Sequence, residues 1–130
     1  MRLITKLIIS FLLAGLASPL LAVTREDFEE ERFYELKDAG EVILVDIFAN
    51  WCPTCARQRE ILDQYQEKHP DAPLHILTVN YNTQRDWVRH FEATRQSTFI
   101  LYNGNERTWM SVAETDKDRI FARLNEALDT

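Results

Sequence analysis

The sequence has two cysteines, Cys52 and Cys55, whose spacing allows them to act together. Only Pro53 and Thr54 separate them, and the surrounding pattern places the pair where a buried strand turns into a helix. A cysteine at a helix N-terminus is favoured as a thiolate by unpaired backbone N–H groups and by the helix dipole. Pro53 lacks an N–H and suits the first helical turn. Cys55 lies one turn further along the same face, so its sulfur can reach that of Cys52.

This pairing indicates thiol–disulfide exchange. We expect Cys52 to attack a substrate disulfide and Cys55 to resolve the mixed disulfide, which leaves a Cys52–Cys55 disulfide and a reduced substrate; the reverse sequence would donate a disulfide. A purely stabilising disulfide is a weaker interpretation, because so short a loop yields little entropic stabilisation. A metal half-site would need ligands from a second chain, and the three histidines are dispersed.

The elements that must position this pair alternate along the chain. A nearly continuous apolar run predicts a strand at 42–49, covered on both faces, and a helix follows at 53–68. The other expected elements are a helix at 24–37, a strand at 74–81, a helix at 83–95, strands at 98–102 and 107–112 joined by an Asn-Gly turn, and a helix at 115–128. The expected fold class is therefore α/β, with a mixed central sheet of about four strands flanked by helices.

The first residues predict an export signal. Arg2 and Lys6 precede an apolar run at 7–17 that is shorter than a bilayer span, and Ala22 offers a small residue for cleavage. We therefore expect a signal peptide at 1–22 and one domain at 23–130, with an uncleaved membrane anchor as the alternative. Export would place the cysteines in an oxidising compartment, the periplasm in a Gram-negative cell.

The charge balance argues against nucleic acid as the main partner. The chain has 15 basic and 21 acidic residues, a net charge of −6, which becomes −8 when the signal peptide with its two basic residues is removed. Phosphate binding needs clustered Lys and Arg. We expect no cofactor, no bound metal and a monomeric protein.

The stretch VILVDIFANWCPTCARQREILDQY, residues 42–65, resembles the thioredoxin family, and the similarity runs over about 24–128. Asp46, Trp51 and the Ile61–Asp63 run match the family's pattern. The Pro-Thr pair between the cysteines is similar to that of membrane-tethered thioredoxins that reduce apocytochrome c in the bacterial periplasm. The resemblance implies a thioredoxin-like fold, protein thiols and disulfides as substrates, and a reductant that draws electrons from a membrane donor. An oxidase, with an easily reduced disulfide, would run in the opposite direction.

The resemblance also singles out Asp46 as the proton relay for Cys55. Asp46 is a lone charged residue in a buried strand, where burial would raise its pKa toward a useful range. The alternative is an Asp that reaches solvent or a Lys. The family often carries a Lys on the next strand, and Thr78 stands at that position here.

Ser97 marks a departure from the family pattern. Thioredoxins carry a cis-proline opposite the cysteine pair, and Ser97 stands at its position. A cis bond before a non-proline residue costs about 3–4 kcal/mol, so we predict a trans Gln96–Ser97 bond. Ala113 likewise stands where the family tends to have a Gly. The resemblance implies substrate contacts from six residues: Trp51, Pro53, Thr54, Gln96, Ser97 and Thr98.

The same departure supports an alternative function. A thioredoxin-fold binding module, with Cys52 and Cys55 as a redox switch or a metal clip, would turn over little because Ser97 replaces the proline. In this family, loss of that proline can open the site to metal. The two functions differ in whether the purified protein turns over disulfides or holds a metal.

Overall fold

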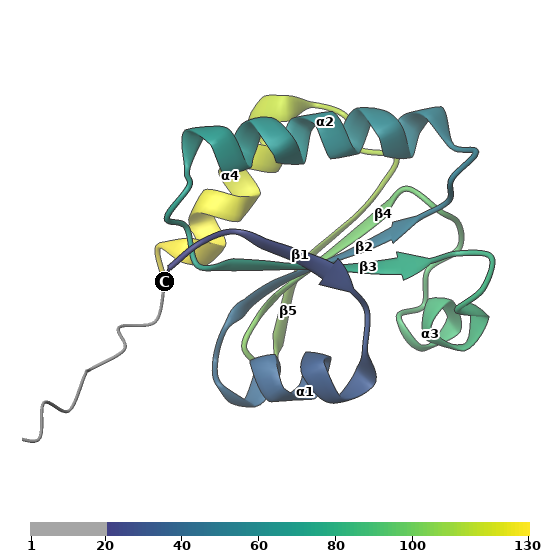
Figure 1. Cartoon of the computed structure of the whole chain (residues 1–130), viewed down its shortest axis with the longest axis horizontal. Helices are drawn as coiled ribbons and strands as arrows, with labels where there is room; N and C mark the ends of the chain where they lie inside the picture. Colours follow the sequence, from purple (N-terminus) through teal and green to yellow (C-terminus); the bar gives the residue numbers. More distant parts are fainter. Residues whose placement is uncertain (1–20) are drawn as a thin grey trace, which may run out of the picture.

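The computed structural model describes residues 21–130, in which strands and helices alternate around one sheet (Figure 1). Five strands and four helices follow one another in this part of the chain. In order they are β1 (Thr24–Asp27), α1 (Glu30–Asp38), β2 (Val42–Phe48), α2 (Pro53–Lys68), β3 (Leu74–Asn80), α3 (Arg85–His90), β4 (Thr98–Asn103), β5 (Glu106–Val112) and α4 (Lys117–Leu128).

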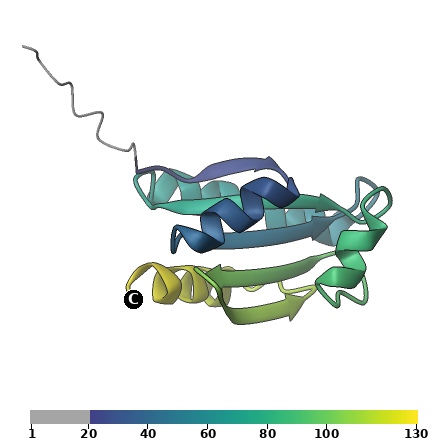
Figure 2. The ribbon, with the colours of Figure 1, turned by 90° about the horizontal axis from the view of Figure 1, so that it is seen from below.

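The strands form one mixed sheet in the order β1-β3-β2-β4-β5, and Figure 2 shows them side by side in that order. β3 runs parallel to both β1 and β2, whereas β4 is antiparallel to β2 and to β5. β2 therefore lies at the centre of the sheet, and the end of this central strand leads directly into the cysteine pair.

Helices cover both faces of the sheet: α2 and α4 lie on one side, and α1 and α3 on the other (Figures 1 and 2). Successive side chains of β2 point to opposite faces. Val42 and Leu44 pack in the cluster that includes α2 and α4, while Ile43, Val45 and Ile47 pack in the cluster that includes α1 and α3. This alternation explains the continuous apolar run, and it places the side chain of residue 46 on the α2 face.

α2 and α4 pack apolar side chains into one cluster on the same face of the sheet. Ile61, Leu62 and Tyr65 of α2 are buried against the sheet together with residues of α4. The Tyr65 hydroxyl donates a hydrogen bond of 2.8 Å to Asn125 Oδ1 of α4. These contacts hold α2, and thus the cysteines at its N-terminus, in a fixed position over the sheet.

The prediction of a helix at 24–37 is wrong for its first residues. Residues Thr24–Asp27 form β1 and pair with β3, and the helix begins only at Glu30. The pairing satisfies backbone groups along β1, and Phe28, which follows it, is buried while its N–H donates to Thr78 O. The described sheet therefore has five strands, one more than expected.

The third helix is shorter than the predicted 83–95, because α3 ends at His90. Glu92 has a φ of 59°, a left-handed conformation that stops the helix, and Ala93 N donates to Val88 O across the turn. The remaining predicted elements agree with the structure to within two residues at each end.

The signal peptide predicted at 1–22 lies outside the described residues except for its last two positions. Within 21–130, no helix has the length and apolar character needed to cross a membrane.

Candidate active site: a buried dithiol at the start of α2

Cys52 caps the N-terminus of α2 with its own sulfur. Its backbone is extended, with φ −97° and ψ 110°, and its Sγ accepts a hydrogen bond of 3.1 Å from the Cys55 backbone N–H. Pro53 follows as the first helical residue, as the sequence predicts. Both cysteines are free thiols and are buried, with 6% of Cys52 and 3% of Cys55 exposed.

The two sulfurs differ in their acidity. Burial disfavours the Cys52 thiolate, but hydrogen bonds with the Cys55 thiol, with Ser97 and from the backbone of Cys55 and Thr54 outweigh it and lower the pKa of Cys52. Burial raises the pKa of Cys55, and its hydrogen bond to Cys52 raises it further. Cys52 is therefore the sulfur that more readily becomes a nucleophile.

Ser97 lies against both sulfurs. Its Oγ is 3.0 Å from Cys52 Sγ and 3.2 Å from Cys55 Sγ, and its side chain is fully buried. No cis peptide bond occurs in residues 21–130, so the Gln96–Ser97 bond is trans, as predicted. Ser97 reaches this position with a φ of 61°. The sequence identified the position of Ser97 but did not predict that its hydroxyl contacts both sulfurs.

Gln58 holds the Ser97 segment in place, a role that was not predicted from the sequence. Its Nε2 donates to Ser97 O at 3.2 Å and to Glu114 O at 3.0 Å, and its side chain is completely buried. Ala113 N also donates to Ser97 O, at 2.8 Å. Gln58 lies three residues after Cys55, on the same face of α2, and this spacing was the available signal.

Asp46 is buried beneath α2, as the sequence predicts, with 7% of its surface exposed. Its Oδ1 has no hydrogen-bond partner. Burial raises the pKa of Asp46 from 3.8 to about 6, while the charges of Arg25 and Arg59 oppose the rise. Thr78 pairs with Asp46 in the sheet, but its hydroxyl donates to β1 instead. The proximity of Arg25 to Asp46 was not predicted, because residues 24–37 were expected to form a helix and not a strand of the sheet.

The other predicted substrate-contact residues differ in accessibility. Trp51 is 60% exposed and Pro53 is exposed, whereas Thr54 and Gln96 are partly exposed. Thr98 is fully buried and its hydroxyl donates to Arg95 O at 2.7 Å, so this side chain is already engaged within the fold. Val112, which pairs with Thr98 and is 43% exposed, adds an accessible apolar side chain that the sequence did not suggest.

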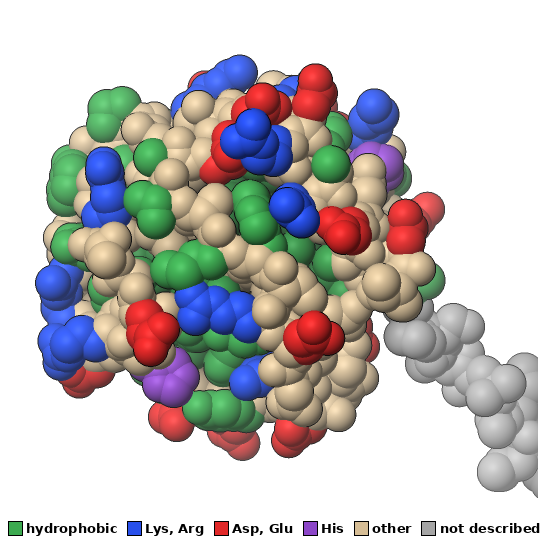
Figure 3. All heavy atoms as spheres, turned by 180° about the vertical axis from the view of Figure 1, so that it is seen from behind, with side chains coloured by type: hydrophobic (Ala, Val, Ile, Leu, Met, Phe, Trp, Pro, Cys, Tyr) green, Lys and Arg blue, Asp and Glu red, His purple; other side chains and the backbone are tan. Residues whose placement is uncertain are grey.

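The surface shown in Figure 3 carries basic and acidic side chains interspersed with hydrophobic ones. This face has no continuous basic area of the kind that binds a phosphate backbone. Among residues 21–130, no group of three or more His, Cys, Asp or Glu side chains is arranged to hold a metal ion.

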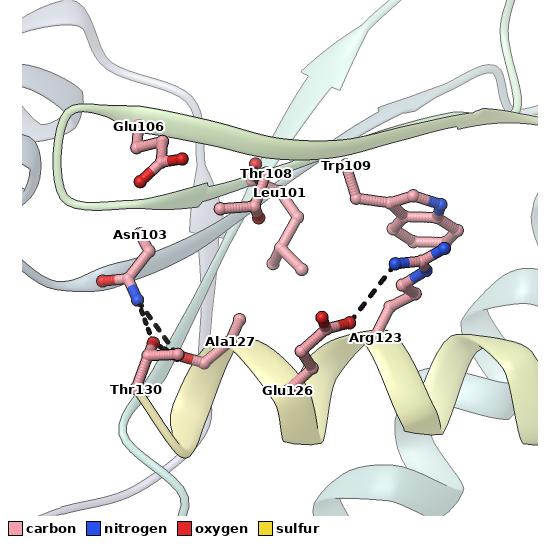
Figure 4. A pocket seen from close by; sticks show the side chains of 9 residues that line it. All are labelled: Leu101, Asn103, Glu106, Thr108, Trp109, Arg123, Glu126, Ala127 and Thr130. Carbon is pink, nitrogen blue, oxygen red and sulfur yellow. Dashed lines mark hydrogen bonds and ion pairs between the residues drawn. The ribbon is translucent and has the colours of Figure 1, made fainter.

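A separate hollow of about 220 Å³ lies between α4 and the β4–β5 hairpin (Figure 4). Its polar groups are largely paired with one another: Asn103 donates to Ala127 O and to Thr130 Oγ1, and Arg123 pairs with Glu126. No cysteine or histidine lines it. The dithiol is therefore the stronger candidate for chemistry. The lining residues are Leu101, Asn103, Glu106, Thr108, Trp109, Arg123, Glu126, Ala127 and Thr130.

A parallel strand that leads into a capped dithiol, with a buried carboxyl beneath the helix, defines a thiol–disulfide exchange protein. Comparison with known proteins agrees with this class. The thioredoxin family model, described as "Thioredoxin", matches residues 20–126. The chain belongs to the thioredoxin family. Membership and the Cys-X-X-Cys pair together support thiol–disulfide oxidoreductase activity.

Individual relatives extend this comparison. The crystal structure of Trxlp from Edwardsiella tarda EIB202 is 30% identical and superposes with a TM-score of 0.73, over 78% of this chain and 98% of that one. Thioredoxin from Alicyclobacillus acidocaldarius subsp. acidocaldarius is 22% identical over 76% of this chain and 93% of that protein. A Caenorhabditis elegans peptide-N(4)-(N-acetyl-beta-glucosaminyl)asparagine amidase is 30% identical over 63% of this chain, but the match spans 13% of that protein.

Proposed function

We propose that this protein reduces protein disulfides through its Cys52–Cys55 dithiol. The Cys52 thiolate attacks one sulfur of the substrate disulfide, that S–S bond breaks, and the electron pair leaves with the other sulfur as a thiolate. Cys55 then loses its proton and attacks Cys52 Sγ. The mixed disulfide breaks, the second substrate thiolate leaves, and the protein is oxidised by two electrons to the Cys52–Cys55 disulfide.

The observation that carries this assignment is the asymmetry of the two sulfurs. Hydrogen bonds lower the pKa of Cys52, whereas burial and the neighbouring sulfur raise the pKa of Cys55. Cys52 is also the more exposed of the two. A substrate sulfur would therefore meet the more acidic thiol first, and the more buried thiol would resolve the intermediate.

Asp46 is proposed as the base that takes the proton of Cys55. It lies on the α2 side of the sheet, its Oδ1 is unpartnered, and burial raises its pKa to about 6. A carboxyl with such a pKa is mostly ionised at neutral pH and can accept a proton transiently. Arg25 and Arg59 keep its pKa from rising further.

Substrate contact is assigned to the accessible side chains beside the dithiol. Trp51 and Val112 are large apolar side chains that remain exposed, and Pro53 is exposed at the helix start. Exposed aromatic residues of this kind commonly anchor protein partners. Gln96 and Thr54 add polar groups at the same end of the molecule.

We place this activity in an exported, periplasmic protein because of the basic and apolar N-terminal sequence at 1–22. A reductant in an oxidising compartment must be reduced again after each turnover. The electron source is therefore proposed to be a membrane donor, and the polypeptide substrates to be exported proteins that contain disulfides.

Turnover of insulin disulfides tests the function. The reduced residue 23–130 domain should reduce insulin, while Cys52→Ser should abolish turnover and Cys55→Ser should permit at most one adduct per molecule. A Cys52–Cys55 potential near about −270 mV, typical of a thioredoxin, would support a reductant, and one near about −120 mV, typical of a strong disulfide donor, would show an oxidase. Absence of insulin reduction by the wild type would refute the proposed activity.

The metal-clip alternative is supported by one observation, the convergence of two sulfurs and the Ser97 hydroxyl within 3.2 Å. Such a clip would need further ligands from a second chain. Metal analysis and native mass spectrometry of the protein purified without chelator distinguish the two functions. Metal bound between two chains, lost in Cys52→Ser, would favour the clip; a metal-free monomer that turns over insulin would exclude it.

A further inference from the structure

We propose that the Ser97 hydroxyl is a catalytic group of this site, which hydrogen-bonds whichever of the two sulfurs carries the negative charge. The inference rests on the proposed dithiol function and assigns a role to the residue that departs from the family pattern. It differs from the substrate-contact role expected from the sequence, because the hydroxyl is directed at the protein's own sulfurs.

The contact geometry supports this role. Ser97 Oγ lies 3.0 Å from Cys52 Sγ and 3.2 Å from Cys55 Sγ, so one hydroxyl is shared between the two reacting atoms. A hydroxyl has one proton to donate and two lone pairs to accept with. It can therefore accept from the protonated sulfur while it donates to the ionised one.

This ability matches the two steps of disulfide exchange. In the dithiol, the Ser97 O–H donates to the Cys52 thiolate, which also has a hydrogen bond with the Cys55 thiol. Once Cys52 has entered the mixed disulfide, its charge is gone, and the Ser97 O–H turns to the Cys55 thiolate. The serine keeps its own proton throughout, and the proton that Cys55 loses passes to the base, Asp46 in the proposed function.

The backbone around Ser97 fixes the hydroxyl in this place. Ser97 has a φ of 61°, a conformation that non-glycine residues seldom adopt. Its carbonyl accepts from Gln58 Nε2 at 3.2 Å and from Ala113 N at 2.8 Å, and no part of the side chain reaches solvent. A buried hydroxyl held in this way is preorganised for the charge that develops beside it.

Other ionisable groups also lie on the elements around the sulfurs. Asp46 of β2 is buried on the α2 face, and Tyr81, after β3, packs against the cysteine cluster. Glu114, whose carbonyl shares the Gln58 donor with Ser97, is paired with Arg119. β4 and β5 contribute the uncharged residues Thr98 and Val112 next to Ser97. The hydroxyl is therefore a substantial polar contributor to the thiolate environment, and its removal should be measurable.

Two substitutions at this position and one control test the proposal. Ser97→Ala removes the hydroxyl, and Ser97→Gly removes it while suiting the positive φ, so at least one variant should fold. Ser111→Ala is the matched control, because Ser111 lies in neighbouring β5 and its buried Oγ has no partner. The Cys52 pKa is read from the ultraviolet absorbance of the thiolate against pH, and the redox potential from equilibration with glutathione.

Loss of the hydroxyl should shift the thiolate equilibrium about tenfold, which raises the pKa of Cys52 by about one unit. At a pH where wild-type Cys52 is ionised, the potential should become more negative by about 30 mV, because the reduced form loses a stabilising contact. Ser97→Ala and Ser97→Gly should agree, and Ser111→Ala should match the wild type.

A Cys52 pKa in both Ser97 variants equal to that of Ser111→Ala would overturn the role of the hydroxyl. This readout needs no turnover and is therefore separate from the insulin assay. If the wild type fails to reduce insulin but its thiolate pKa depends on Ser97, the proposed function fails and the hydroxyl contact stands. If insulin is reduced equally well in all variants at all pH values, the catalytic role of Ser97 is refuted.

Discussion

Replacement of Asp46 by Asn should make the stability of the protein less dependent on pH. In the native state, burial raises the pKa of Asp46 from 3.8 to about 6. Between these values the native protein binds a proton that the unfolded chain has lost, so the free energy of unfolding falls as pH rises from about 4 to above 6. At about 1.4 kcal/mol per pKa unit, this loss amounts to about 3 kcal/mol.

Urea unfolding of the reduced protein at pH 4 and pH 7.5 measures the effect. The stability of Asp46→Asn relative to the wild type should increase by about 2.4 kcal/mol from the lower to the higher pH, because pH 4 already lies slightly above the carboxyl pKa of the unfolded chain. Any fixed penalty for burying the amide is the same at both pH values and drops out of this difference. Asp46→Ala should show the same change, although its cavity lowers stability at both.

Asp63→Asn is the control for removal of an acid near Arg25. Asp63 lies on α2, is 55% exposed and pairs with Arg25 at 3.0 Å, an exposed ion pair of small energy. Its effect on stability should be under about 1 kcal/mol. A relative stability of Asp46→Asn that is equal at pH 4 and pH 7.5, or that falls with pH, would refute the assignment of Asp46 as a buried acid of raised pKa.

Three further predictions concern the groups around the site. Gln58→Met removes the amide that donates to the Ser97 and Glu114 carbonyls, and it should lower the free energy of unfolding by about 1–3 kcal/mol. The control Gln64→Met, at an exposed position of α2, should change the free energy of unfolding by less than about 0.5 kcal/mol, and equal effects of the two substitutions would contradict the Gln58 contact. Arg59→Gln removes a charge that lowers the pKa of Asp46, so carboxyl NMR should show that pKa above about 6, and an unchanged or lower value would oppose the coupling. Trp51→Ala should reduce kcat/KM for insulin about fivefold, or about 1 kcal/mol, with less effect on a small disulfide; equal losses would argue against a protein-contact role.

The sequence predicts the local features of the site well. The apolar run of β2 and the proline after Cys52 place the dithiol at a strand-to-helix junction, and the predicted helix at 53–68 coincides with α2. These features depend on neighbouring residues, because periodicity and first-turn proline act within one segment. The burial of Asp46 also follows locally, from its place inside that run.

Features that depend on distant pairing were not predictable in the same way. The side chains at 24–27 suit the start of a helix, but the backbone there pairs with β3, about fifty positions away in sequence. The Gln58 contact with Ser97 spans 39 residues and is visible only once α2 lies against the segment before β4. Tertiary pairing therefore decided both the extra strand and the polar contacts that position Ser97.

The most direct test of the dithiol mechanism is to trap its intermediate. Cys55→Ser, reduced and mixed with a disulfide-containing protein, should form a covalent adduct through Cys52 that a thiol reductant releases. Peptide mass spectrometry should locate the bond at Cys52, and the wild type should pass rapidly to the Cys52–Cys55 disulfide. No adduct with Cys55→Ser, or undiminished disulfide reduction by Cys52→Ser, would contradict Cys52 as the nucleophile.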